Sequence, residues 1–458
     1  MKTEELYLSR TRNSSILHER AVRVLPGGVT SSLRMRHPYP FYIRKAEGSK
    51  VVDVDGNEYL DFVMGAGPLI LGHRPPAVIQ AVREQLEKEF QGFFPTELEV
   101  ELAEKVREYV PCAEMVRFVP SGTEACTTLC RIARAYCNKD KIAKVEGGYH
   151  GQYDATLVSQ YPLPGISGPA NHPRPVFDSI GMPRRVLDEV VVLPFNNIEA
   201  SVRLLRENAR ELAAVLVEPI LGPAGMIVAK KEYLKALREV TEENDVLLIF
   251  DEVQTGFRLG LGGAQQFFGL KPDLAMLGKI LGGGFPIGAC VGRKDIFDRV
   301  VTPTSNLYVN MSSKIFQSGT FSGHSVSLAA GLATIKELEK GHIYPYLNKI
   351  SSKLREGLAA ISNDTGAKIQ VTGLESMFGI HFTKHSIESL RDVYRFSDAS
   401  MREQFARWLL VKHNIINGPR VSYAHSEGDI EKFLKSSEDA IRNIMTGRTP
   451  TTTIQENR

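Results

Sequence analysis

The sequence has little cysteine and no long apolar run. Its five cysteines are odd in number and form no CxxC pair, which disfavours a disulfide framework and a zinc site. The longest apolar runs, such as VLLIF, are far shorter than the roughly 18–20 residues of a membrane span. The N-terminal stretch MKTEELYLSRTRNSS also lacks the apolar core of a signal peptide. We therefore expect a soluble, cytoplasmic protein with no metal site.

An excess of charge is also missing. Fifty-six Lys and Arg face 53 Asp and Glu, and the formal net charge is +3. Such a balance gives no basic field for nucleic acid or an acidic membrane, so we expect small-molecule partners. The 458 residues are 43% hydrophobic and predict two or three structural units at about 100–200 residues each.

Short apolar runs alternate with helical patterns between about residues 115 and 251. The runs include MVRFV, KIAKV, VVVL, AAVLV and VLLIF. Runs of this kind predict an α/β fold with a mainly parallel sheet buried on both faces. Because ligands bind beyond the carboxyl ends of such strands, we expect chemistry at Ser121, Glu218 and Asp251.

The remaining chain predicts a domain order. Alternation around Asp55-Gly56 indicates a hairpin, and we expect residues 1–70 to pack with a small C-terminal domain. The large domain is expected over 71–325 and a smaller α+β domain over 326–446, followed by a flexible tail over 447–458. A long loop rich in Pro and Gly is expected over 159–188.

The stretch PSGTEA follows an expected strand and begins a helix. Ser121 can cap that helix in a capping box with Glu124, and Gly122 allows close approach of a ligand. The free N–H groups and the helix dipole would bind a phosphate, although an ordinary well-capped helix shows the same pattern. Neither a Walker loop nor a GxGxxG after a strand is present.

Asp251 and Lys279 complete a chemical pattern. Asp251 ends an apolar strand, so its carboxylate needs a cationic partner. Lys279 lies among glycines in LGKILGGGFPIG, where desolvation would lower its pKa and make the amine nucleophilic. A phosphate site, a strand-end acid and such a lysine are what pyridoxal phosphate requires.

With these motifs, the chain resembles the class III aminotransferases, which are fold-type I pyridoxal phosphate enzymes. The likeness runs from LPGGVTSSLR to AHSEGDI and is closest to glutamate semialdehyde aminomutases and β-amino acid aminotransferases. The resemblance implies that Lys279 forms the imine with pyridoxal 5'-phosphate and that Asp251 bonds the pyridine nitrogen. It also implies that Val253 packs on the ring and that Gln254 lies near the phenolic oxygen.

The same resemblance assigns the rest of the cofactor site. Ser121, Gly122 and Thr123 match the phosphate-binding turn, and Tyr149 in GGYHG matches the aromatic residue that stacks on the ring. Glu218 in VEPI matches an acid of the cofactor network. Thr320 in SGTFSG matches a threonine that reaches the phosphate of the neighbouring subunit, which implies a homodimer with shared active sites.

Two neighbours of these residues stay outside the assignment. His150 fits a hydrogen-bonded loop residue as well as a catalytic one. Glu252 follows Asp251 on an extended chain and points the other way, so we expect a structural role for it.

The chain departs from the aminomutases at the substrate side. Ala66 stands where the aminomutases have Trp, and the only Trp is Trp408, so we expect a roomier pocket. Arg420 in NGPRVSYAHSEGD resembles a carboxylate-binding arginine of β-amino acid aminotransferases, whereas Arg34 in GGVTSSLR matches that of the aminomutases. The sequence does not rank these two arginines.

The sequence therefore predicts a pyridoxal phosphate-dependent aminotransferase. It would move an amino group from a carboxylate-bearing amine, such as a β-amino acid, to a keto acid. Three alternatives stay open: a glutamate-1-semialdehyde 2,1-aminomutase, an amino acid racemase or epimerase, and a non-catalytic cofactor-binding protein. A requirement for a keto acid distinguishes the first reaction from the others.

Overall fold

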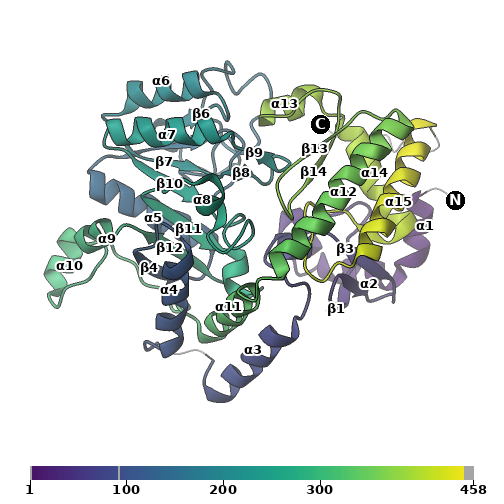
Figure 1. The fold of residues 1–458 in the computed structure, drawn as a ribbon, viewed down its shortest axis with the longest axis horizontal. Helices are drawn as coiled ribbons and strands as arrows, with labels where there is room; N and C mark the ends of the chain where they lie inside the picture. The colour runs from purple at the N-terminus through teal and green to yellow at the C-terminus, as the bar shows by residue number, and fades with distance from the viewer. Residues whose placement is uncertain (1–2, 91–92, 448–458) are drawn as a thin grey trace.

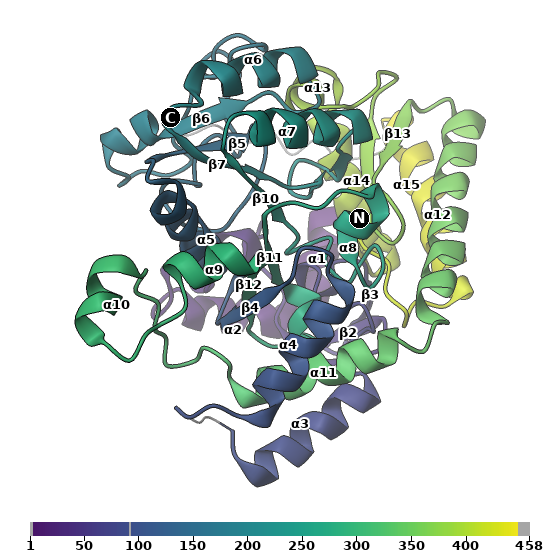
Figure 2. The same ribbon diagram turned by 60° about the vertical axis from the view of Figure 1, so that its left-hand side comes forward.

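The computed structural model of the chain describes residues 3–90 and 93–447. A large sheet with its covering helices lies on one side of the molecule, and a smaller sheet with long C-terminal helices lies on the other (Figure 1 and Figure 2). No helix within the described residues is both long and apolar enough to cross a membrane.

The large sheet has seven strands in the order β4-β12-β11-β10-β7-β5-β6. Neighbouring strands run parallel except β12, which is antiparallel to β11 and β4. Every residue of β7, β10, β11 and β12 is buried, and the expected α/β fold with a mainly parallel sheet is confirmed. The strands are β4 (Met115–Val119), β5 (Lys141–Val145), β6 (Val190–Leu193), β7 (Leu212–Val217), β10 (Leu247–Asp251), β11 (Leu274–Gly278) and β12 (Gly288–Gly292).

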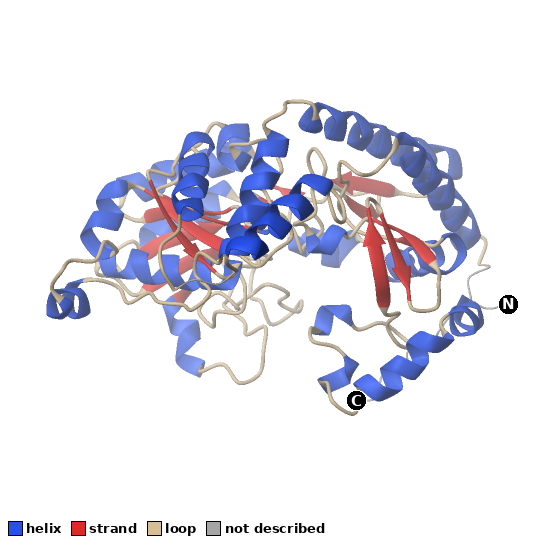
Figure 3. Ribbon diagram, turned by 90° about the horizontal axis from the view of Figure 1, so that it is seen from below, coloured by secondary structure: helices blue, strands red, loops and turns tan. Residues whose placement is uncertain are grey.

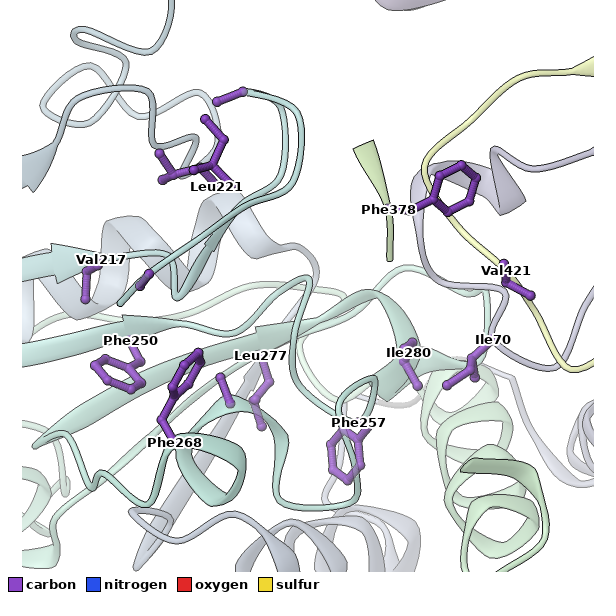
Figure 4. Close-up of a cluster of buried hydrophobic side chains, with 14 of the residues drawn as sticks. Ile70, Val217, Leu221, Phe250, Phe257, Phe268, Leu277, Ile280, Phe378 and Val421 are labelled. Atoms are coloured by element: carbon purple, nitrogen blue, oxygen red, sulfur yellow. The ribbon is translucent and has the colours of Figure 1, made fainter. Parts of the chain in front are cut away.

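Helices cover both faces of this sheet because successive strand side chains point to opposite sides. On β10, Ile249 packs in a core cluster with α5 (Gly122–Cys137). Phe250 belongs to a second cluster with α7 (Lys231–Glu243), and Figure 4 shows it beside Phe268. The continuous apolar runs of the sequence therefore reflect burial on both faces.

The smaller sheet joins the two ends of the chain. The hairpin expected around Asp55-Gly56 is confirmed, with β2 (Lys50–Asp53) antiparallel to β3 (Glu58–Asp61). β1 (Ile43–Glu47) pairs with β2, and the two-residue β15 (Ile415–Ile416) pairs parallel with β3. Figure 3 shows this sheet apart from the large one.

A two-stranded antiparallel hairpin of β13 (Ile369–Thr372) and β14 (Gly379–Phe382) lies among the C-terminal helices. The remaining elements are α1 (Thr3–Arg10), α2 (Arg12–Ala21), α3 (Pro76–Lys88), α4 (Glu97–Tyr109), α6 (Ile198–Asn208), β8 (Ile220–Leu221), β9 (Ile227–Val228), α8 (Gly263–Phe268), α9 (Lys294–Val300), α10 (Leu307–Ser313), α11 (Ser325–Leu338), α12 (Ile343–Thr365), α13 (Leu390–Phe396), α14 (Ala399–His413) and α15 (Glu427–Met445).

The long loop expected over 159–188 is confirmed up to residue 183, and its last residues form a short 3-10 helix over Arg184–Glu189 instead. The domain boundaries stay a prediction. Of the tail expected over 447–458, residues 448–458 lie outside the described residues.

Candidate functional site

A cavity of about 380 Å³ lies at the carboxyl ends of β4, β7 and β10. This is the edge at which a parallel sheet binds its ligand. The lining includes nine of the residues expected from the sequence, which are Ser121, Gly122, Thr123, Tyr149, Glu218, Asp251, Val253, Gln254 and Lys279. The fold thus brings together residues that are up to 158 positions apart.

One end of the cavity is the first turn of α5. Ser121 caps the helix, with its hydroxyl accepting from the Glu124 N–H at 3.2 Å. The reciprocal half of the expected capping box is not formed within the described chain. The first-turn N–H groups of Gly122 and Thr123 have no partner inside the helix, and together with the helix dipole they suit a phosphate.

Close packing fixes this turn. A Cβ on Gly122 would lie 3.2 Å from Cγ2 of Val253, and a Cβ on Gly151 would lie 2.4 Å from Oγ1 of Thr123. The Thr123 hydroxyl also accepts from the N–H of Gln152 at 3.3 Å. The backbone after Tyr149 therefore holds the side chain of Thr123 in place.

Asp251 is buried at the end of β10 and has two partners. Its Oδ1 accepts from the Val253 N–H at 3.0 Å, and its Oδ2 lies 2.8 Å from Nδ1 of His150. Burial lowers the pKa of His150, with Asp251 opposing the shift. Because a carboxylate only accepts, we assign the proton to Nδ1, so a neutral imidazole orients Asp251.

His150 also lies in the cavity lining, although its sequence fits a loop residue equally well. It is buried, and its Nε2 has no hydrogen-bond partner among the described residues. Its place directly after Tyr149 is the only signal in the sequence, and that place does not indicate where the imidazole points. Glu252, in contrast, accepts from the N–H groups of Ala264 and Gln265, so its expected structural role fits the geometry.

Glu218 and Gln254 link the cavity to its surroundings. Glu218 is buried, and its Oε2 accepts from the Tyr149 N–H at 3.0 Å. Burial raises the pKa of Glu218 well above its usual value, and the nearby Asp251 adds to this shift. Gln254 accepts through Oε1 from Nη2 of Arg420 at 2.7 Å.

Lys279 directly follows β11 and has a positive φ of 46°, a conformation that costs free energy for a residue with a Cβ. Burial lowers its pKa to about 8, and Asp251 opposes the shift. A buried amine of this kind exists near neutral pH in both its charged and its nucleophilic form.

The residues expected at the substrate side are not equivalent in position. Arg420 is buried, and a Cβ on Gly67 would lie 3.1 Å both from its Nε and from Cδ of Lys279. Arg34 is exposed and donates to the hydroxyl of Thr30 at 2.8 Å. Of the two arginines, the one beside the cavity in this chain is Arg420.

Ala66 and Thr320 lie outside the cavity lining. Ala66 is exposed on a turn with φ of 66° and directly precedes Gly67. Thr320 is on an exposed segment, and its expected contact with a second subunit stays a prediction.

These features fit pyridoxal phosphate in one cavity. A helix N-terminus offers free N–H groups, a buried carboxylate is held by a neutral imidazole, and a lysine of lowered pKa is present. These residues could therefore hold the phosphate, the ring nitrogen and the aldehyde carbon of that cofactor.

Comparisons with known proteins agree with this geometry. Residues 32–402 match the family model described as aminotransferase class-III. The chain is 41% identical over 431 residues to the glutamate-1-semialdehyde 2,1-aminomutase of Archaeoglobus fulgidus, covering 93% of this chain and 98% of that protein, and further curated relatives of similar identity have the same name.

Among solved structures, an omega-transaminase from Sphaerobacter thermophilus superposes with a TM-score of 0.88 at 36% identity, covering 94% of this chain and 98% of the other. A beta-phenylalanine aminotransferase from Variovorax paradoxus gives 0.83 at 29% identity, with 97% and 96% covered. The fold is that of the fold-type I enzymes. The chain therefore belongs to the class III aminotransferase family, whose enzymes use pyridoxal 5'-phosphate.

Proposed function

We propose that Lys279 binds the cofactor covalently and that Asp251 pairs with its ring nitrogen. Both residues line the same cavity and end or follow the adjacent strands β10 and β11. The bound cofactor supplies a charged ring that accepts electrons from a deprotonated substrate carbon. Asp251 keeps the ring nitrogen protonated, and His150 holds the carboxylate in its orientation.

The remaining lining residues take the other parts of the cofactor. Ser121, Gly122 and Thr123 bind the phosphate through the start of α5. Val253 and Tyr149 pack on the two faces of the ring. Support comes from the close approach of Val253 to Gly122 and from the Tyr149 N–H, which is fixed on Glu218.

Two further residues complete the network around the ring. Gln254 lies near the phenolic oxygen, and Glu218 holds the turn of Tyr149. Burial raises the pKa of Glu218, so this acid binds a proton more readily than an exposed glutamate does.

Lys279 moves the proton at the substrate carbon. Its pKa of about 8 lies near neutral pH, where a general base combines a populated free form with useful basicity. As a free amine beside the bound substrate, Lys279 would take the proton from the substrate carbon and could deliver it to another carbon.

We propose that the reaction transfers an amino group from a carboxylate-bearing amine to a keto acid. The observation that carries this proposal is the buried guanidinium of Arg420. It lies against Gly67, as the side chain of Lys279 does, and its Nε has no hydrogen-bond partner among the described residues. A planar guanidinium binds a carboxylate through two N–H groups. The resemblance to the aminomutases, which have Trp in place of Ala66, is the ground for proposing donors larger than the semialdehyde; Ala66 directly precedes Gly67.

The names of the curated relatives favour a second candidate, the isomerisation of glutamate 1-semialdehyde. They support this alternative better than the aminotransferase expected from the sequence. Both reactions exchange an amine at the same cofactor, and they differ in whether a separate keto acid takes up the amino group.

One panel of assays distinguishes the candidates. The holoenzyme is supplied with α-amino acids, β-amino acids and simple amines, each with pyruvate or 2-oxoglutarate, and separately with glutamate 1-semialdehyde alone. Transfer that requires a keto acid supports the aminotransferase. Conversion of the semialdehyde without any keto acid, together with inactivity on every donor, would establish the aminomutase. Loss of optical purity of an amino acid without a keto acid would indicate a racemase or epimerase.

We also propose a homodimer in which Thr320 contacts the phosphate in the partner's cavity. Four strongly exposed aromatic residues lie before α4 and in the segment that carries Thr320: Phe93, Phe94, Phe316 and Phe321. The segment packs on α4, since a Cβ on Gly323 would lie 2.9 Å from Oε1 of Glu99. Exposed aromatic groups of this density mark a protein interface.

A further inference from the structure

Arg258 is a buried arginine next to the proposed carboxylate-binding site. It is 1% exposed and lies in the loop that follows β10. Its Nη2 donates to the carbonyl oxygen of Gly67 at 2.5 Å, and its Nη1 donates to the hydroxyl of Ser376 at 3.1 Å. Its Nε has no partner among the described residues.

Both partners of Arg258 also contact Arg420 or its neighbours. Gly67 approaches Nε of Arg420, and the carbonyl oxygen of Ser376 accepts from the Val421 N–H at 2.9 Å. The next residue, Met377, forms an antiparallel bridge with Arg420. Figure 4 shows Phe378 and Val421, which follow Met377 and Arg420 in the chain, above the pair of Ile70 and Ile280.

Neither arginine forms an ion pair within the part of the chain that the structure describes. Asp61 and Glu218 act on Arg420 only from beyond ion-pair distance, and both arginines leave a buried Nε without a hydrogen-bond partner. Burial, followed by the charge of Arg420, lowers the pKa of Arg258 to about 9, and burial lowers the pKa of Arg420 to about 10. Unpaired buried charges are costly, and an unsatisfied buried donor indicates a missing partner.

We propose that Arg258 is the positioning residue of the Arg420 site: it holds Gly67 and Ser376 against Arg420 and adds a second uncompensated positive charge that selects substrates with a carboxylate. This inference rests on the proposed role of Arg420 in substrate binding. A carboxylate entering the site would neutralise part of the buried charge, whereas a neutral group would leave both guanidinium groups unpaired.

The preference for carboxylate over neutral ligands should therefore depend on Arg258, because Arg258 positions the residues around Arg420. A site built for a charged or hydrogen-bonding group strongly rejects an analogue that lacks it, because its buried polar groups then stay unpaired. Removing Arg258 should weaken carboxylate binding while changing the binding of a neutral probe much less.

The test uses the holoenzyme and two non-reacting probes of similar shape, propanoate and propanamide. Binding of each is followed by a titration of the visible absorbance. The variants are Arg258→Met, which removes the charge and both hydrogen bonds, Arg258→Lys, which keeps a charge without the planar fork, and Arg420→Met. Ser376→Ala removes one acceptor of Arg258 and leaves all charges, so it stands in if Arg258→Met does not fold.

The matched control is Arg355→Met. Arg355 is partly buried, and it donates to the carbonyl oxygen of Glu375, next to Ser376. It does not contact Gly67, so its loss tests general loosening of this turn. We expect it to leave the ratio of propanoate to propanamide affinity as in the wild type.

We expect Arg258→Met to weaken propanoate binding at least tenfold relative to propanamide, and to raise KM for carboxylate donors more than it lowers kcat. Arg258→Lys should recover part of the loss, and Ser376→Ala should produce a smaller loss of the same kind. Two results would overturn the role of Arg258 alone. In the first, Arg258→Met weakens the binding of propanoate and propanamide equally. In the second, every Arg258 and Ser376 variant binds propanoate as the wild type does, while Arg420→Met does not. Propanoate binding that does not change in Arg420→Met would instead overturn the proposed carboxylate site.

Discussion

At the scale of single residues, the chain contains two buried lysines of similar acidity in different surroundings. Burial lowers the pKa of both Lys279 and Lys144 to about 8. Lys144 lies outside the cavity lining, and its ammonium donates to the carbonyl oxygens of Gly148 and Val158. A lowered pKa therefore does not distinguish the proposed cofactor lysine from Lys144. The two lysines differ in whether their side chains line the cavity.

This difference predicts the site of covalent attachment. Borohydride treatment of the holoenzyme should fix the cofactor on Lys279, because its amine lines the cavity, and leave Lys144 unmodified. Peptide mapping by mass spectrometry measures the two sites. Lys279→Ala should bind no cofactor covalently and show no turnover; labelling of Lys144 or wild-type activity in that variant would contradict the assignment.

The same burial predicts how stability depends on pH. The pKa of Lys279 falls from its ordinary 10.5 to about 8 on folding, so between these values the unfolded chain binds more protons and stability rises with pH. Well below pH 8 the charged amine therefore costs the cofactor-free protein about 3 kcal/mol of stability relative to the neutral amine.

We therefore expect Lys279→Met to be more stable than the wild type at pH 7 when both lack the cofactor. This advantage should shrink by about 2 kcal/mol between pH 7 and pH 10, because the wild-type lysine loses its charge over this range. Urea unfolding of the two proteins at both pH values measures the difference. A constant difference would mean that Lys279 is not desolvated in the cofactor-free protein.

At the scale of elements, the phosphate-binding turn depends on contact between α5 and the loop after Tyr149. Gly151 has φ of +91°, and an added Cβ would lie 2.4 Å from Oγ1 of Thr123. Gly165 in the long loop has φ of +96° with open space around it. Both substitutions to Ala incur the strain of a positive φ, of about 1–2 kcal/mol, and differ only in the collision with α5.

Gly151→Ala should weaken cofactor binding at least tenfold, because Thr123 and the first turn of α5 must shift. Gly165→Ala should bind the cofactor nearly as the wild type does. Dissociation constants from fluorescence titration of the cofactor-free proteins measure both effects. Equal affinities for the two variants would show that the turn tolerates displacement and does not position the phosphate.

Most elements and the cofactor side of the site could be predicted from the sequence. The five apolar residues VLLIF predict a buried strand, and Asp251, which follows them directly, predicts a functional carboxylate at the end of that strand. Two-residue β15 carries no such pattern, since its pairing with β3 is decided by the tertiary fold. The hydrogen bond of His150 and the contacts of Arg258 with Gly67 and Ser376 join distant segments, so no local spacing could reveal them.

At the scale of the whole molecule, the proposed dimer explains the exposed aromatic residues. Phe94 and Phe316 are each 80% exposed, and a charge at either position would be buried without a partner in an interface. We expect Phe316→Glu to dissociate the protein into monomers and to lower cofactor affinity, since Thr320 of the partner would be lost.

Light scattering coupled to size-exclusion chromatography measures this effect. Ile198→Glu, on the exposed start of α6, is the control and should leave the molecular mass unchanged. A wild-type protein that is monomeric and fully active at low concentration would contradict the shared active site.

The pairing of β3 with β15 also determines which part of the protein can fold first during synthesis. Leu60 pairs with Ile415, so the small sheet closes only after some 350 further residues have been added. The seven strands of the large sheet are all present once Gly292 has been made, and domains fold as units while the chain grows. Arg420 leaves the ribosome after β15, whereas Lys279 and Asp251 leave it far earlier. A nascent chain should therefore acquire its cofactor cavity before it acquires any ability to discriminate between substrates.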